Sequence, residues 1–106
     1  MRSLVEPLLD RQQLMEEFHF TGYSSEEQGQ LWDLLTRAME MQALDALLDR
    51  LSQSDQRALL QHLTEDELES QVEQYLSRVL PEHHELLLQA IVQYKEQLRR
   101  DLARAK

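Results

Sequence analysis

The chain has 106 residues, enough for one domain with a modest hydrophobic core. Hydrophobic residues make up 42% and charged residues 29%, which excludes a disordered composition, and only two glycines and two prolines argue against a loop-rich or all-β fold. Cysteine is absent, which excludes disulfides, thiol catalysis and zinc–thiolate sites and favours a reducing, cytoplasmic location. No apolar run approaches the ~20 residues that span a bilayer, so we expect no membrane partner and no secretory leader.

The net charge of −9 is unevenly distributed. Residues 1–81 carry 6 basic and 16 acidic side chains, which gives −10, whereas residues 82–106 carry 5 basic and 4 acidic side chains, which gives +1. This acidity disfavours nucleic-acid binding, because phosphates are neutralised by lysine and arginine. The acids are densest over 65–73 and the bases over 95–106. Helix-dipole compensation explains both clusters, although the basic end could also contact an anionic partner.

A helix-start pattern, Ser/Thr-x-x-Asp/Glu, occurs three times ahead of a leucine-bearing run, at 24–27, 52–55 and 64–67. In this pattern the N-cap hydroxyl accepts a hydrogen bond from the N3 amide, and the N3 acid accepts one from the N-cap amide. Pro81 is a fourth start signal, since proline suits the first turn of a helix. The pattern therefore predicts N-caps at residues 24, 52 and 64 and a further helix start at Pro81.

These boundaries predict an all-α fold, a compact bundle of four to five helices in a single domain of residues 1–106. Residues 1–6 are expected to form a frayed lead, and Gly22 is expected to end the first helix in the left-handed conformation. The predicted helices cover, in chain order, about 7–18, 25–51, 53–62, 65–79 and 82–104. The second and fifth are the longest, so we expect the bundle to be built around them.

The predicted helix over 25–51 is apolar around nearly half of its circumference, more than a surface helix needs. One apolar stripe consists of Leu31, Leu34, Leu35, Ala38 and Met41. An adjacent apolar stripe consists of Trp32, Met39, Ala43 and Ala46. The expected solvent side is marked by Asp33, Arg37 and Glu40. This helix is therefore expected to be central in the bundle or to face a partner.

The predicted helix over 82–104 is also apolar on two sides. Its main stripe follows a 4-3-4 spacing, at Leu87, Ile91, Tyr94 and Leu98. Leu88 and Val92 lie outside this stripe. Because a large exposed apolar patch usually marks an interface, we expect a protein partner or a second copy of the chain to be bound here. The candidate interface residues are Trp32, Met39, Leu88, Val92 and Tyr94.

No residue pattern indicates a catalytic, cofactor or metal site. Glu16 and His19 have the Glu-x-x-His spacing of di-iron bundles, but no second copy of that motif follows. Neighbouring residues on a helix diverge by about 100°, so the Glu-His-His-Glu cluster at 82–85 is expected on the polar surface of a first turn. Ser24 and Ser52 are explained as caps, and no glycine-rich phosphate loop or nucleophile elbow occurs. We therefore expect no enzyme activity and no cofactor.

Three motifs carry a likeness to a known family, namely Phe18-x-Phe20-x-Gly22-x-Ser24-x-Glu26-Glu27-Gln28, Leu51-Ser52-x-x-Asp55 and Leu80-Pro81-Glu82-His83. Over about residues 18–100 the chain resembles an uncharacterised family of small bacterial all-helical domains. The resemblance implies a helical domain without an assigned function, and no functional residue is carried over from it.

Three functional hypotheses follow from the sequence. The leading one is a non-enzymatic helical protein–protein interaction module, either homodimeric or bound to another protein. The alternative is a small acidic regulator, such as an antitoxin-like inhibitor, that offers residues 65–73 to a basic partner. The third is an enzyme whose pocket the sequence does not reveal. Ionic strength separates the first two, because a contact between charges weakens steeply with salt and an apolar contact does not.

Overall fold

The structure is a computed structural model that describes residues 3–65 and 69–105. Within these ranges the chain is helical apart from turns and short connections. A 3₁₀ helix, η1 (Glu6–Leu8), precedes the α-helices, which are α1 (Arg11–Glu17), α2 (Ser25–Leu48), α3 (Gln53–Thr64), α4 (Glu69–Val79) and α5 (His83–Arg104). The all-α prediction is confirmed, and α2 and α5 are the longest helices, as the sequence predicts.

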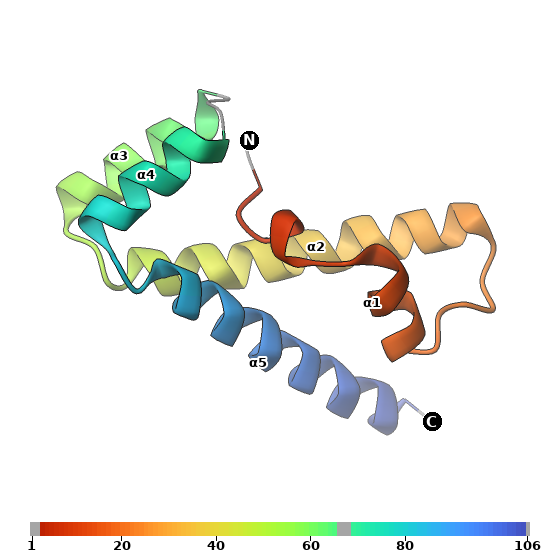
Figure 1. Ribbon diagram of the computed structural model, residues 1–106. Helices are drawn as coiled ribbons and strands as arrows, with labels where there is room; N and C mark the ends of the chain where they lie inside the picture. Colours follow the sequence, from red (N-terminus) through yellow and green to blue (C-terminus); the bar gives the residue numbers. More distant parts are fainter. Residues whose placement is uncertain (1–2, 66–68, 106) are drawn as a thin grey trace.

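The two long helices form the frame of the molecule. α2 and α5 pack against each other and diverge toward the C-terminus of α5, with α1 lying across the wider end (Figure 1). α3 and α4 form a helical hairpin beside the end of α2 and the start of α5 (Figure 1). The chain therefore places the N-terminal segment between this hairpin and the two long helices.

The hydrophobic core is one cluster, to which α2 contributes buried side chains between Leu35 and Leu47. Its largest fully buried side chains are Val5, Leu14, Met15, Met39, Leu47, Leu59, Leu63 and Leu76. Burying one such side chain stabilises the fold by about 1.5–3 kcal/mol. The radius of gyration is 15.1 Å, compared with about 13 Å for a compact domain of this length. The helices thus form an elongated body that leaves part of the surface of α2 uncovered.

Two of the three predicted N-caps are confirmed. The Ser24 hydroxyl accepts the Glu27 amide at 3.2 Å, and Glu27 Oε1 accepts the Ser24 amide at 3.3 Å, which completes a capping box. The Ser52 hydroxyl likewise accepts the Asp55 amide at 3.2 Å. A cap that the sequence pattern missed is Asp10, which accepts the amide of the third residue of α1.

The predicted cap at Thr64 is wrong. Thr64 is the last residue of α3, and its hydroxyl donates to the carbonyl of Leu60 at 2.6 Å. α3 extends past the predicted end at residue 62 because Leu63 is fully buried in the core. Glu65 is the C-cap of α3 and not the start of the next helix, while Glu67 lies outside the described residues.

The left-handed residue that ends α1 is His19, with φ 61°, and not Gly22 as predicted. The Phe20 amide donates to the carbonyl of Met15 at 2.7 Å, and the His19 amide donates to that of Glu16 at 3.2 Å. These two bonds form a Schellman motif, in which glycine is the usual left-handed residue. The motif ends α1 at Glu17, so Gly22 is not needed for this purpose.

α2 is rotated about its axis relative to the predicted orientation. Met39 and Ala43 are fully buried, whereas Leu34 and Met41 are 64% and 70% exposed. Glu40, predicted on the solvent side, is only 8% exposed. Because α2 carries apolar residues on both sides, hydrophobic periodicity did not determine which side faces the core. The bonding partners of Glu40, described below, stabilise the observed orientation.

Candidate functional site

A buried carboxylate on α2 holds the N-terminal segment in place. Glu40 accepts the Leu4 amide at 2.8 and 2.9 Å through its two oxygens, and Oε2 also accepts the Val5 amide at 3.2 Å. The Ser3 hydroxyl donates to the same Oε2 at 2.8 Å. η1 has no side-chain cap of its own at Val5, so Glu40 serves amides at its start that would otherwise lack partners. These charge-assisted bonds explain how a carboxylate is tolerated in the core.

Residues 3–8 therefore form a strap, referred to below as the N-terminal strap. Leu4 is 8% exposed and Val5 is fully buried. The expectation of a frayed lead is wrong for residues 3–6, while residues 1–2 lie outside the described part of the chain. The sequence pattern could not reveal the strap, because its anchor Glu40 lies 36 residues from Leu4.

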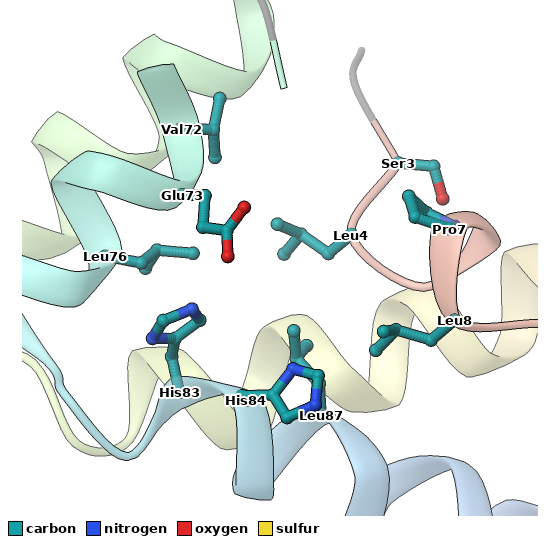
Figure 2. A pocket seen from close by; sticks show the side chains of 10 residues that line it. All are labelled: Ser3, Leu4, Pro7, Leu8, Val72, Glu73, Leu76, His83, His84 and Leu87. Carbon is teal, nitrogen blue, oxygen red and sulfur yellow. The ribbon is translucent and has the colours of Figure 1, made fainter. Parts of the chain in front are cut away.

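The N-terminal strap, α4 and the start of α5 line a cavity of about 130 Å³ that is partly open to the surface (Figure 2). Its lining residues are Ser3, Leu4, Pro7 and Leu8 from the strap, Val72, Glu73 and Leu76 from α4, and His83, His84 and Leu87 from α5. Most of these side chains are aliphatic. Because an apolar cavity of about 150 Å³ accommodates a benzene ring, this cavity matches one apolar side chain in size.

Three titratable side chains border this aliphatic space. The Glu73 carboxylate points into the cavity beside Leu76 (Figure 2). His83 is 8% exposed, and its Nδ1 lies 3.0 Å from the carbonyl oxygen of Leu80. Since a carbonyl only accepts, Nδ1 is the donor of this contact. The predicted placement of residues 82–85 on the polar surface is wrong for His83, whereas His84 is exposed.

The arrangement is suited to binding, and it does not assemble a nucleophile with a base. Ser3 supplies the one hydroxyl of the described lining, and it donates to Glu40 and accepts from the Glu6 amide at 3.1 Å. Among the described residues, no group of three or more ligand-type side chains could hold a metal ion. Glu16 and His19 do not share a helix face, because His19 lies past the end of α1. The cavity can take an apolar group, and Glu73 can accept an N–H donor or pair with a cation.

The five predicted interface residues lie in different environments. Met39 is fully buried, so a partner cannot reach it in this conformation. Trp32 and Tyr94 are half-buried and pack against the core. Leu88 and Val92 are 42% and 53% exposed. Only these last two of the five present a large free surface, and the structure does not gather the five into one patch.

The basic segment 95–106 is partly used within the molecule. Lys95 Nζ lies 3.2 Å and Arg99 Nη2 3.4 Å from Oε2 of Glu17. The Arg99 guanidinium also lies 5.4 Å from the centre of the Phe18 ring. These contacts fix α1 on α5, which leaves fewer bases for an anionic partner. The acidic segment 65–73 lies partly outside the described residues.

No protein-family model matches the chain, and no curated protein or solved structure is significantly similar to it. The resemblance to an uncharacterised bacterial helical family stays a prediction. Among the described residues, no helix combines the length and apolar character needed to cross a bilayer.

Proposed function

We propose that the chain is a non-enzymatic protein-binding module that receives one apolar side chain of a partner in the cavity beneath the N-terminal strap. The supporting observation is the composition of the cavity, in which aliphatic side chains from three separate elements surround about 130 Å³. The exposed residues Pro7, Glu73 and His84 border it, so the apolar space is continuous with the molecular surface. Interfaces commonly depend on one such buried anchor within a polar rim.

The strap keeps this space from collapsing. Leu4 and Leu8 line the cavity, and the backbone of Leu4 is bonded to both oxygens of Glu40. Moving the strap inward would break bonds to a buried carboxylate, and this cost opposes collapse of the cavity. The cavity is thus preformed, which lowers the cost of ordering it when a partner binds.

A displayed library of random short peptides, selected against the wild-type chain, tests this function. Leu8→Trp fills the cavity with a larger side chain, and Met41→Gln is the matched control on the far side of α2. We expect the selected peptides to lose about tenfold or more in affinity for Leu8→Trp, because the anchor is displaced. Their affinity for Met41→Gln should change less than about twofold. Peptides that bind all three proteins equally, or a library that yields no binder, would contradict the proposal.

A second candidate function is the acidic regulator that contacts a basic partner, and the orientation of Glu73 favours it. Its carboxylate points into the cavity, so a lysine or arginine of the partner could pair with it (Figure 2). The same peptides distinguish the two functions. Affinity that falls steeply with added salt and is lost in Glu73→Gln supports the regulator, whereas affinity that is indifferent to both supports the apolar anchor.

A further inference from the structure

We propose that a second copy of the chain packs on the outward face of α2 as an antiparallel helix pair centred on Met41. This face, the α2 seam, consists of Leu34, Arg37, Met41, Asp45 and Leu48. None of these residues lines the cavity, so the proposal is independent of the proposed function.

The apolar residues of the α2 seam recur at the spacing of paired helices. Leu34, Met41 and Leu48 are seven residues apart, which places them on one side of α2 at intervals of two turns. Leu34 and Met41 are 64% and 70% exposed, and Leu48 is half-buried. The row extends over about 21 Å at the rise of an α-helix. A straight apolar row of this kind is complementary to another helix with the same row.

The fold leaves this face open at Leu34 and Met41, while Leu48 at its end packs partly against the core. Met41 lies about 200° around the helix from Met39, which is fully buried in the core. α1 and α5 both lie on the core side of α2 (Figure 1). The radius of gyration of 15.1 Å, larger than the compact value of about 13 Å, reflects the same one-sided packing. Two copies joined along α2 would cover the outer faces of both.

Charge complementarity selects the second copy and its direction. When two antiparallel copies of α2 meet at Met41, Leu34 faces Leu48 of the second copy, and Arg37 faces its Asp45. Arg37 and Asp45 are exposed, and within the described residues neither side chain makes an ion pair or hydrogen bond. By symmetry the opposite charges meet twice. A parallel pair would instead bring Arg37 to Arg37 and Asp45 to Asp45, which is repulsive.

The absence of cysteine from the chain allows a direct test of this register. Met41→Cys should form a disulfide-linked dimer under mild oxidation, because the two-fold axis brings both copies of residue 41 together. Leu88→Cys, at an exposed position of α5, is the matched control and should remain largely uncrosslinked. Absence of the Met41→Cys dimer, or equal crosslinking of both variants, would overturn the proposal.

A charge-swap series tests the pairing without a crosslink. Arg37→Asp and Asp45→Arg should each weaken self-association at least tenfold, as measured by sedimentation equilibrium, and the double swap should restore it. Circular dichroism verifies that all three variants keep their helical content, which is expected because both positions are exposed. A strict monomer across a wide dilution series of the wild type, or a double swap that restores nothing, contradicts the proposal.

Discussion

Two carboxylates attach the N-terminal part of the chain to the long helices, and they do so by different means. Glu40 is 8% exposed and accepts from backbone amides and a hydroxyl of the N-terminal strap. Glu17 is partly exposed and lies between Lys95 and Arg99 on α5. Its Oε2 accepts no hydrogen bond from the described residues and is compensated by the two cations, while its Oε1 accepts from Lys95 Nζ at 3.5 Å. Amide donors in a fixed backbone cannot turn away from Glu40, whereas lysine and arginine can exchange Glu17 for water.

The difference indicates which contact the site depends on. The wall formed by Leu4 and Leu8 belongs to the strap that is bonded to Glu40 through the amides of Leu4 and Val5. α1 is less dependent on its ion pair, because Leu14 and Met15 anchor it in the core. We therefore expect a large loss of stability when Glu40 is changed and a small one when Glu17 is changed.

Glu40→Gln should have the largest effect. The amide group removes the charge and turns an N–H donor toward the amides of Leu4 and Val5, which are left without full partners. We expect the free energy of unfolding to fall by about 2–4 kcal/mol. For a domain of this size, each kcal/mol lowers the melting temperature by roughly 4–8 °C. Urea denaturation measures the change, and a loss below about 0.5 kcal/mol would mean that the strap is held by its leucines alone.

Tyr75→Phe tests the contact of a third acidic residue, Asp55, whose partner is a neutral side-chain hydroxyl and not a backbone amide or a cation. The Tyr75 hydroxyl donates to the Asp55 carbonyl at 3.3 Å and lies 3.4 Å from Oδ1 of the same residue, joining α4 to α3. Because this donor is a single neutral side chain, we expect its removal to cost about 1 kcal/mol. Thermal denaturation at neutral pH checks it, and a loss as large as that of Glu40→Gln would remove the distinction between backbone and side-chain donors.

Ionisation of the same residue, Tyr75, is expected to lower the stability of the protein at alkaline pH. Burial, with a contribution from the charge of Asp55, raises the pKa of Tyr75 above its usual value of 10.0. The unfolded chain therefore loses this proton first, so stability is level below pH 10 and falls as pH rises through the folded pKa. Urea denaturation between pH 8 and 11 should show a shallower fall for Tyr75→Phe. An identical fall in both proteins would mean that other tyrosines carry the effect.

The His19→Gly variant tests how much the left-handed backbone conformation at the end of α1 affects stability, apart from the ion pair of Glu17. His19 has φ 61°, a conformation that glycine adopts without the strain of a Cβ atom. We expect the variant to gain about 0.5–1 kcal/mol in stability, measured by urea denaturation. A loss would show that the imidazole makes a contribution larger than the backbone strain.

Glu17→Gln should have the smallest effect. A partly exposed ion pair contributes about 0.2–1 kcal/mol, and salt screens it. The wild type and the variant should therefore differ slightly at low ionic strength and converge in high salt. A difference that persists in high salt would mean that Glu17, like Glu40, contributes through more than a screened ion pair.

Local features of the fold were predictable from sequence, and long-range ones were not. Ser24 and Ser52 were predicted as caps from the acidic residue three positions ahead, and each accepts the amide of that residue in the structure. The pattern at Thr64 is the same, but burial of Leu63 extends α3 past it. Tertiary packing outweighs a cap, because a buried leucine contributes more free energy than one hydrogen bond.

The candidate site depends on contacts that no local pattern encodes. From the sequence alone, Glu40 is predicted to be a solvent-facing residue of an amphipathic helix. Its hydrogen-bond donors could not be foreseen, because they lie 35 and 36 residues away. The cavity has walls from three elements that are distant in sequence, with Leu8, Leu76 and Leu87 among them. Leu87 was assigned to the main apolar stripe of its helix, but the convergence of the three leucines around an open space requires the packing of the helices to be known.

The proposed anchor cavity is tested most directly by methyl NMR with benzene as the probe. We follow the methyl resonances of Leu8, Leu76 and Leu87 at the cavity, and those of Leu34 and Met41 on the outer face of α2 as controls. We expect saturable shifts at the three cavity leucines, little change at the controls, and loss of the response in Leu8→Trp, because a cavity of about this size accepts a benzene ring. Cavity methyls that do not respond, or shifts of equal size at Leu34 and Met41, would contradict it.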